Sequence, residues 1–418
     1  MKFILSLAFK NLFRYKRRTL ITAISIAVGL MTYILVESLL VGAEQESVRN
    51  LKWYETSSAR IYRQGYWDER LQYPLDKAIK DPSKVLASLE KNGWKATPRT
   101  VFSADMILYS DDFSEDGNLP VLVTAIDPEK DNQVFHFADT LAEGRFLKPR
   151  DENGILLGSW LAEDIGAKVG YWVTLVTRGN GGFYEAMDMQ VVGILNCPNP
   201  NVNRTLLMMD IKSANEHLGM EGSVTELDVF IPDNKELGKA IQDIGTIATS
   251  VDGQLETYSW SDLARDYLAA LSADKGSSYL ILFLVFIIAS VGISNTMLMA
   301  MQERIRELGM MRTLGVSDQQ IRLAFLFEAG GIGLIGSLFG ILLGILGNIY
   351  LVQVGIDFGW MMRDFNIGYR IQSIFRGTWN FRTLLFAFLS GIILSMFVAI
   401  LPVRQALRKD IPSCLHHQ

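Results

Sequence analysis

The chain has 418 residues, 49% apolar and 20% charged, with a formal net charge of -5 and two cysteines. So few cysteines exclude a disulfide framework as the main source of stability. Residues 43–277 hold 37 of the 45 acidic residues and 23 of the 40 lysines and arginines, a balance of -14 against +9 for the rest of the chain. Because nucleic-acid binding needs a basic face, this acidic segment argues against nucleic acid as a partner.

The apolar residues gather in four runs, 19–41, 279–301, 323–354 and 384–403. At 1.5 Å per helical residue, each run is long enough to cross the ~30 Å hydrocarbon core of a bilayer. We therefore predict a membrane protein with four transmembrane α-helices and a large mixed α+β domain inserted between the first and the second. The predicted parts are an interfacial amphipathic helix (1–18), the first span (19–42), the α+β domain (43–277), the second span (278–301), a short connecting helix (302–322), the third span (323–354), an outer loop (355–383), the fourth span (384–403) and a tail (404–418).

Positive charge predicts the orientation in the membrane. Residues 2–18 carry six lysines or arginines and no acid, and such segments stay in the cytoplasm. The run that follows is too long for the 7–15 apolar residues of a cleaved signal, so we expect it to anchor the chain. Four crossings then place both termini in the cytoplasm and the acidic domain on the outer side of the membrane. Four arginines in the outer loop argue against this orientation, which we keep because the first helix usually dominates; they are Arg363, Arg370, Arg376 and Arg382.

The segment 43–277 mixes helix and strand signals. Asp81 and a following proline predict an N-cap and a helix that ends at Gly93. Strand-like runs follow at 101–109, 119–126, 172–177 and 187–195, and a second helix is predicted at 235–247. We expect two lobes, one built from the two ends of the domain and one from a strand-rich insertion.

A glycine-rich turn between two of these strands predicts a β-hairpin. From the residues alone, an ordinary surface turn is the interpretation. The residues concerned are Arg178, Gly179, Asn180, Gly181, Gly182 and Phe183.

The segment 301–315 breaks the apolar pattern between two membrane runs. Arg304, Leu308, Met311 and Gly315 follow the i, i+4, i+7, i+11 spacing of one helical face, and the segment contains no proline. We predict a short helix lying across the mouth of two spanning helices. A solvated connector of mixed charge is the alternative.

The third run carries a row of glycines, Gly336, Gly340 and Gly344, at intervals of four. This spacing leaves one helix face without side chains and predicts close helix packing. A G-x-G-x-x-G match nearby lies inside an apolar helix, so it is no dinucleotide site. Asn295 predicts an interhelical hydrogen bond, and we expect Glu328 to have a structural partner on the short helix.

No G-x-x-x-x-G-K-[ST] occurs in these residues, so we expect no P-loop here and no ATP bound by this chain. The histidines lack metal-ligand spacing, and no Ser/His/Asp grouping can be argued. We therefore expect a chain that is not itself an enzyme, with no cofactor or metal site of its own.

The stretch ERIRELGMMRTLG, continued by VSDQQIRLAFLFEAG, resembles the lipoprotein-releasing (Lol) and MacB type permeases of ABC transporters, the FtsX-like permease family. AFKNLFRYKRRTLITAISIAVG resembles the opening of these proteins, and LPVRQALRKDIPSCL resembles their closing signature through Pro402, Ala406, Asp410, Pro412 and Leu415. The outer segment containing GRF matches more loosely, since Tyr171 stands where an acid is frequent. The resemblance implies that the short helix is a coupling helix that docks on a separate ATPase. Its coupling residues would be Glu303, Arg304, Glu307, Leu308, Met311, Arg312, Leu314 and Gly315.

The resemblance also implies the partners. They are a cytoplasmic ATPase dimer that binds ATP and Mg, a second permease, membrane lipids, a lipoprotein substrate and a periplasmic carrier. The resemblance places the chain in a bacterial inner membrane with its large domain in the periplasm. It also gives the hairpin at 178–183 a second interpretation, a contact with the carrier. The expected function is mechanotransmission, in which ATP hydrolysis drives the outer domains to extract lipoproteins from the inner membrane. Two alternatives remain, a MacB-type efflux permease for peptides, toxins or drugs and an FtsX-like regulator of cell-wall hydrolases. Replacement of Gly315 or Leu308 by Asp is expected to abolish coupling.

Overall fold

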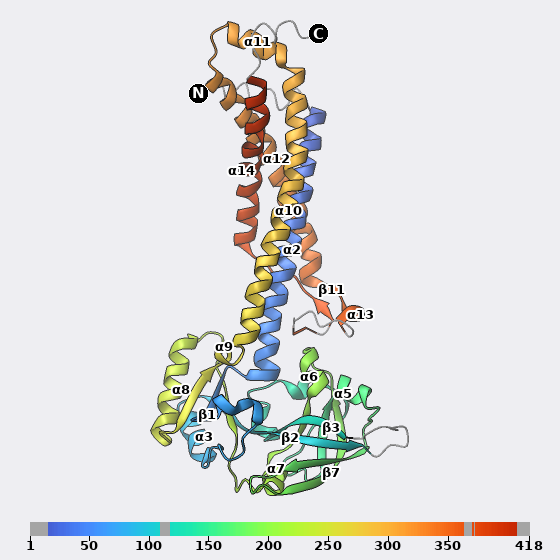
Figure 1. The fold of residues 1–418 in the computed structure, drawn as a ribbon, viewed down its shortest axis with the longest axis vertical. Helices are drawn as coiled ribbons and strands as arrows, with labels where there is room; N and C mark the ends of the chain where they lie inside the picture. The colour runs from blue at the N-terminus through green and yellow to red at the C-terminus, as the bar shows by residue number, and fades with distance from the viewer. Residues whose placement is uncertain (1–15, 109–117, 363–369, 372, 408–418) are drawn as a thin grey trace. The chain divides into compact units, whose positions relative to one another are not determined.

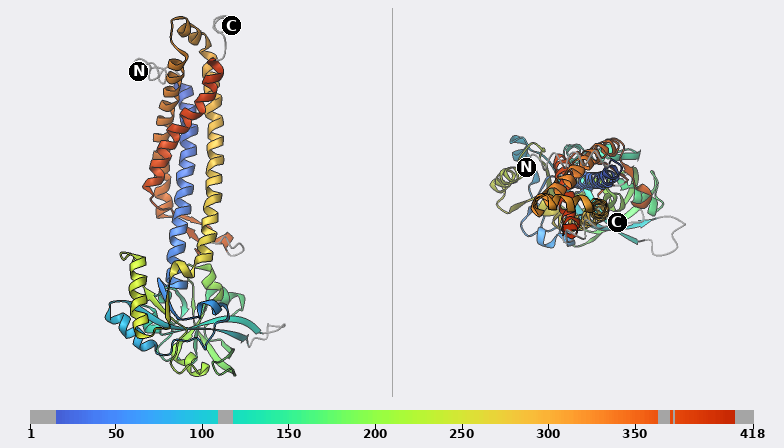
Figure 2. Two further views of the ribbon diagram at one scale, coloured as in Figure 1. Left: turned by 60° about the vertical axis from the view of Figure 1, so that its left-hand side comes forward. Right: turned by 90° about the horizontal axis from the view of Figure 1, so that it is seen from above.

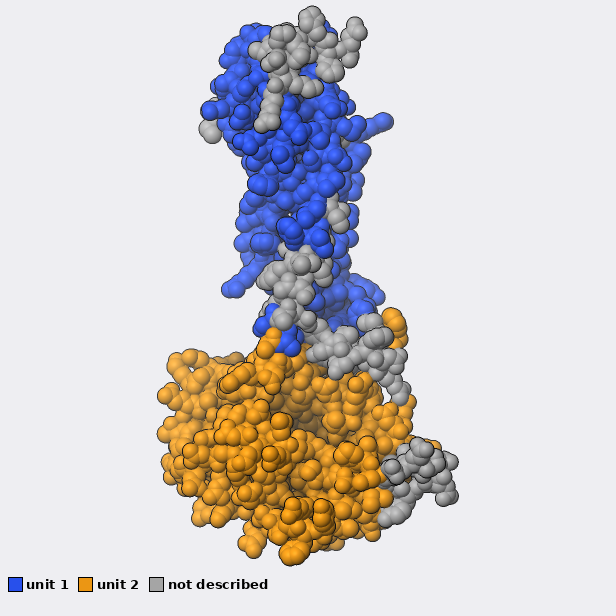
Figure 3. Space-filling view, viewed as in Figure 1, with its two compact units in different colours: residues 1–44, 270–358, 374–418 blue, residues 45–269, 359–373 orange. Residues whose placement is uncertain are grey.

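The structure is a computed structural model that describes residues 16–108, 118–362, 370, 371 and 373–407. Most of the predicted interfacial helix and most of the predicted tail, with Asp410, Pro412 and Leu415, lie outside these residues. The chain divides into two compact units (Figure 3). We call residues 1–44, 270–358 and 374–418 the helical unit, and residues 45–269 and 359–373 the α+β unit.

Long helices running alongside one another make up the helical unit (Figures 1 and 2). Its core is a cluster of small and branched apolar side chains from all four long helices. Many large apolar side chains on their outer faces are exposed, among them Leu342, Phe397 and Leu401, which suits a lipid environment. The elements are α2 (Lys16–Leu51), α10 (Arg265–Glu303), α11 (Ile305–Thr313), α12 (Asp318–Gln353) and α14 (Phe381–Leu407), with the short strands β11 (Ile356–Asp357) and β12 (Ile374–Phe375).

Three helices are long and apolar enough to cross a membrane among the described residues: Thr19–Thr56, Asp318–Gln353 and Phe381–Leu407. The fourth predicted run, 279–301, lies within α10, which is 39 residues long but is not among the three. Helix α12 begins five residues before the predicted run, because Ser317 caps it.

One mixed sheet of ten strands forms the centre of the α+β unit. Most neighbours are antiparallel, while β3 with β8 and β5 with β7 are parallel. The sheet order is β10-β1-β9-β2-β3-β8-β5-β7-β4, and β6 pairs with β2 and β7. The strands are β1 (Ala59–Arg63), β2 (Lys95–Leu108), β3 (Asn118–Ile126), β4 (Leu141–Gly144), β5 (Gly154–Gly158), β6 (Trp172–Arg178), β7 (Tyr184–Leu195), β8 (Leu207–Asp210), β9 (Glu226–Phe230) and β10 (Leu255–Ser259).

One continuous sheet runs through both of the predicted lobes, because β2 belongs to both parts. Residues 95–99 of β2 pair with β9, and residues 99–107 pair with β3. A strand of 14 residues therefore joins the ends of the domain to its middle.

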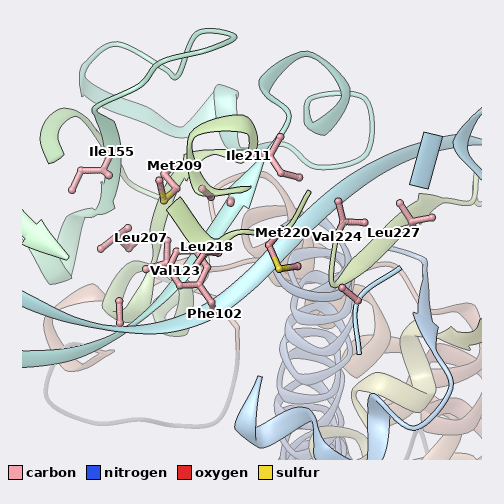
Figure 4. Packing of buried hydrophobic residues seen from close by; sticks show 14 of the residues in the cluster. Phe102, Val123, Ile155, Leu207, Met209, Ile211, Leu218, Met220, Val224 and Leu227 are labelled. Carbon is pink, nitrogen blue, oxygen red and sulfur yellow. The ribbon is translucent and has the colours of Figure 1, made fainter. Parts of the chain in front are cut away.

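Buried apolar side chains from alternate strand positions fill the core beside this sheet (Figure 4). Phe102, Val123 and Met209 come from three neighbouring strands, and Leu218 comes from a covering helix. The predicted helix after Asp81 is present as α3, although the Asp81 side chain makes no capping hydrogen bond and instead contacts Lys84 at 3.0 Å. The helices are α3 (Pro82–Lys91), α4 (Pro128–Asp131), α5 (Ser159–Asp164), α6 (Pro200–Thr205), α7 (Ile211–Leu218), α8 (Leu237–Val251), α9 (Trp260–Leu263) and α13 (Gly359–Met362).

Candidate functional site

The short helix α11 ends in a Schellman motif that fixes its connection to α12. Gly315 has φ 86°, the left-handed conformation that glycine adopts without penalty. The Val316 N–H donates to the Met311 carbonyl and the Gly315 N–H donates to the Arg312 carbonyl, each at 3.1 Å. Ser317 then opens α12 with a capping box closed by Gln320. Helix α11 is therefore held at a defined distance from α12.

A buried ion pair fixes the other end of α11. Arg304 lies at its N-cap, and Arg304 Nη1 donates to Glu328 Oε2 at 3.0 Å. Both side chains are almost fully buried, at 3% and 2% exposed. Glu328 thus has the partner that the sequence led us to expect.

Arg312 ties the end of α11 to two further helices. Its guanidinium donates to both oxygens of Asp318, at 2.9 and 3.1 Å, and to the Leu407 carbonyl at 3.2 Å. Beside it, Met311 packs against the apolar cluster that joins the ends of α10, α12 and α14. The short helix is therefore braced against α12 and α14.

The predicted coupling residues divide into an inner and an outer set. Arg304, Met311 and Arg312 face the neighbouring helices and hold α11 in place, while Leu314 is 83% exposed. Glu303 is exposed and Glu307 is half-buried, and the side chain of Leu308 lies outside the described residues. Met310, which the sequence analysis did not select, is 48% exposed. Part of the predicted coupling set therefore packs against neighbouring helices, and part is exposed.

The three glycines at intervals of four pack α12 against α2. A Cβ at Gly336 would lie 2.8 Å from Ile26 Cβ, and one at Gly344 would lie 2.8 Å from Ile34 Cδ1. A Cβ at Gly340 would lie 3.0 Å from the Ala27 carbonyl oxygen. The predicted close packing is present.

The predicted interhelical hydrogen bond of Asn295 is absent within the described part of the chain, where its side chain is exposed. The reason is helical geometry. Helix α10 buries Ile293, Met297 and Met301, four residues apart, so a residue two positions after Ile293 points to the opposite side.

The predicted hairpin is present as β6 and β7, with Arg178 opposite Tyr184. Its turn is held from two sides, because Asn180 N–H donates to the Leu218 carbonyl at 2.9 Å and Arg178 Nε donates to the Gly182 carbonyl at 3.0 Å. Phe183 at the end of the turn is 78% exposed. Gly179 and Gly181 complete the turn, which presents an exposed aromatic side chain on an ordered backbone.

Arg370 belongs to the α+β unit although it comes late in the chain. Its Nε donates to Glu55 Oε1 at 2.9 Å, and its guanidinium lies 3.8 Å from the ring centroid of Tyr267. Its backbone N–H donates to Ser47 Oγ at 2.9 Å. One of the four positive charges that argued against our orientation is therefore paired with a carboxylate of the same unit.

The sequence analysis missed a buried charge cluster on β1, β2, β9 and α4. Arg60 contacts Asp228 at 2.7 Å and Glu226 at 3.3 Å, and Arg99 contacts Asp131 at 2.8 Å. Two arginines thus face three carboxylates. The pKa of Glu226 is raised to about 7. Burial is the largest cause, Arg60 opposes it, and the neighbouring charge of Asp228 adds to it.

The pH dependence of stability follows from this cluster. The raised pKa of Glu226 stabilises the fold below its ordinary value of 4.5, and this contribution is lost as pH rises through about 7. Between pH 5 and pH 8 we expect the free energy of unfolding to fall by about 2–3 kcal/mol. Burial also raises the pKa of Asp131, which acts in the same direction at lower pH.

Thermal melting of the full chain at pH 5 to 8 measures this effect. The Glu226→Gln variant is expected to lose most of the pH dependence, whereas Glu185→Gln at an exposed position on β7 keeps it. An unchanged slope in Glu226→Gln would contradict the assignment.

Within the described residues, no group of three His, Cys, Asp or Glu side chains could hold a metal ion.

Two family models match the chain. The MacB-like periplasmic core domain matches residues 19–247, more than half of the chain, and the FtsX-like permease C-terminal family matches residues 279–411. These matches confirm the family resemblance drawn from the short helix and its flanking runs.

Curated relatives agree with the family models. The chain is 27% identical over 233 residues to the lipoprotein-releasing system transmembrane protein LolC of Neisseria meningitidis, covering 54% of this chain and 55% of that protein. It is 22% identical over 412 residues to the uncharacterized ABC transporter permease MJ1507 of Methanocaldococcus jannaschii, covering 95% and 94%. It is 22% identical over 420 residues to the macrolide export ATP-binding/permease protein MacB of Pasteurella multocida, covering 96% of this chain and 58% of that protein. The match therefore spans little more than half of the LolC and MacB proteins, and nearly all of MJ1507. The chain belongs to the FtsX-like permeases with a MacB-like periplasmic core domain, the Lol and MacB type of ABC transporter permease.

Proposed function

We propose that this chain couples ATP hydrolysis by a separate ATPase to movement of its α+β unit, and that this movement extracts lipoproteins from the inner membrane. ATP and Mg are bound by the ATPase. A second permease, identical or paralogous, pairs with this chain to complete the transporter.

The bracing of α11 is the observation that carries the proposal. Arg304 and Arg312 fix its two ends to α12 and α14, while Leu314 and Met310 remain exposed. A helix held in this way transmits a push to the spanning helices, because its ion pairs resist independent movement. Exposed apolar residues on a polar segment suit a protein partner.

The position of Arg370 supports four crossings. Its contacts with Glu55 and Ser47 mean that the chain returns to the side of the α+β unit after α12. One crossing between residues 269 and 359 would leave it on the opposite side. An even number of crossings between these residues is needed, which supports our proposal that α10 crosses together with α12.

Charge supports the direction of these crossings. The basic N-terminal segment favours the cytoplasm, and the acidic segment 43–277 favours the outer side. On this orientation α11 meets a cytoplasmic ATPase, and the α+β unit lies in the periplasm.

Release of a lipoprotein from the bilayer requires energy, which ATP hydrolysis would supply. Each CH₂ of an acyl chain contributes about 0.8 kcal/mol to membrane binding, so several chains hold a lipoprotein firmly in the bilayer. The exposed Phe183 at the hairpin turn gives a carrier a place to bind. Energy delivered through α11 would then be used at the outer face.

Export of a small molecule is the second candidate. The match to MacB covers 96% of this chain, against 54% for the match to LolC. An assay that measures both lipoprotein release and macrolide accumulation in vesicles distinguishes the two functions. Release without a change in macrolide level supports extraction, and the reverse supports export.

Replacement of Leu314 by Asp tests coupling. The tagged Leu314→Asp variant and the tagged wild type are purified from the membranes of the cells that produce them. The MgATP hydrolysis associated with the variant is expected to be more than tenfold lower than that of the wild type, because a charge replaces an exposed apolar contact. This variant is preferred to Gly315→Asp, which would strain a residue at φ 86°, and to Leu308→Asp, whose side chain is not described.

Phe183→Asp is the matched control, since Phe183 is equally exposed in the α+β unit. Phe183→Asp should keep the associated ATPase activity. It should lose lipoprotein release if the hairpin engages a carrier, and keep it otherwise. Retention of the ATPase by Leu314→Asp would reject docking at α11. Loss of the associated ATPase activity in Phe183→Asp but not in Leu314→Asp would contradict the proposed orientation and favour the reverse one.

A further inference from the structure

A large groove opens on the helical unit between α10 and α14, with a volume of about 1070 Å³. Its walls are mostly apolar and aromatic, with Phe283, Phe286 and Val291 from α10 and Phe397 and Leu401 from α14. The groove lies within one unit, so its shape depends only on helices that pack together. It is separate from α11 and from the glycine face of α12.

Two arginines line the same groove, Arg322 from α12 and Arg404 from α14. Both are exposed, and within the described residues no carboxylate lies within salt-bridge distance of either. The nearby arginines of the helix α11 region differ in this respect, because Arg304 pairs with Glu328 and Arg312 pairs with Asp318. The groove therefore offers two positive charges that no carboxylate among the described residues neutralises.

The arginines lie at one end of the groove. Arg322 is in the second turn of α12 and Arg404 in the last turn of α14, and these helix ends meet where Arg312 contacts both. From Leu394 to Arg404 the groove extends ten residues along α14, which is about 15 Å at 1.5 Å per residue. This is half of the ~30 Å hydrocarbon thickness of a bilayer, the depth of one leaflet.

We propose that this groove binds one anionic phospholipid of the leaflet at the α11 end, with its acyl chains along α10 and α14 and its phosphate at Arg322 and Arg404. Basic pockets between spanning helices are suited to anionic head groups. A guanidinium binds phosphate oxygens through paired hydrogen bonds. Phosphatidylcholine has the same phosphate, but its choline cation offsets the negative charge, so two arginines favour an anionic head group. A helix of a second copy would instead bury two unpaired arginines, which is costly.

The test compares the purified full chain in nanodiscs of phosphatidylcholine alone and of phosphatidylcholine with phosphatidylglycerol. Phosphatidylglycerol is expected to raise the melting temperature, and native mass spectrometry is expected to find one retained phosphatidylglycerol per chain. The double variant Arg322→Gln/Arg404→Gln should bind it about 10- to 30-fold more weakly, since each basic residue near an anionic surface adds about a factor of five.

Arg306→Gln is the control, because Arg306 is exposed on α11 and does not line the groove. It should retain the lipid and the melting shift. Equal phosphatidylglycerol binding by wild type and double variant overturns the proposal. So does a change of oligomeric state in the double variant without a change in lipid binding, which would assign the groove to a second copy. Neither result bears on ATPase docking at Leu314.

Discussion

Replacement of Arg304 by Gln is expected to lower the free energy of unfolding by about 3–5 kcal/mol, because it leaves Glu328 buried without its positive partner. The two side chains are only 3% and 2% exposed, so water cannot take the place of the lost charge. Glu328→Gln is expected to have a similar effect. Thermal melting in detergent measures both, and coupling should be lost together with stability because α11 is no longer fixed at its N-terminal end.

The double variant distinguishes a pair interaction from a general loss of packing. Arg304→Gln/Glu328→Gln removes both charges and should recover a large part of the loss, since an isolated buried charge costs more than a neutral pair. Arg306→Gln, two residues away and exposed, should melt like the wild type. If the two single losses simply added in the double variant, the ion pair would not be the cause.

Replacement of Gly336 by Leu is expected to destabilise the helical unit by about 3 kcal/mol or more, because overpacking a close helix contact forces the backbones apart. Even a Cβ would lie 2.8 Å from Ile26 Cβ and 2.9 Å from the Ala23 carbonyl oxygen. The backbone oxygen cannot move away as a flexible side chain could. The loss is measured as a fall in melting temperature in detergent.

Gly292→Leu is the matched control on α10. A Cβ at Gly292 would meet no described atom within 4 Å, so this change should have little effect on melting. A Gly336 variant as stable as the Gly292 variant would show that α12 and α2 do not depend on this contact.

The sequence predicts those parts of the structure that depend on spacing within one element. Gly336, Gly340 and Gly344 recur every four residues, and a helix necessarily places them on one face. The short helix between two apolar runs, ended by Gly315, is predictable for the same reason. The hairpin strands follow from their alternation and from the glycine-rich turn between them.

Contacts between distant residues could not be predicted in this way. Arg60 and Asp228 are opposite each other on β1 and β9, and no spacing rule connects positions so far apart. One signal was available, since Glu226 and Asp228 alternate with buried Leu227 and Val229, which places two acids on one face of a strand. Their arginine partners could not have been identified without the strand order.

The division of roles within α11 was also out of reach. The sequence led us to expect a partner for Glu328 on the short helix, but it did not identify Arg304 as that partner or pair Arg312 with Asp318. The sequence identifies the segment, and only the packing of α12 and α14 separates the residues that brace it from those that remain exposed.

The connector between α11 and α12 has a mechanical consequence. Only Leu314, Gly315 and Val316 separate the last residue of α11 from the Ser317 cap, and fully extended they reach no more than about 11 Å. Two backbone hydrogen bonds of the Schellman motif already fold them back on α11. The connector is short and folded, so under the proposed function a load applied to α11 is expected to reach α12 directly. Lengthening it by a few glycines is expected to weaken this transmission.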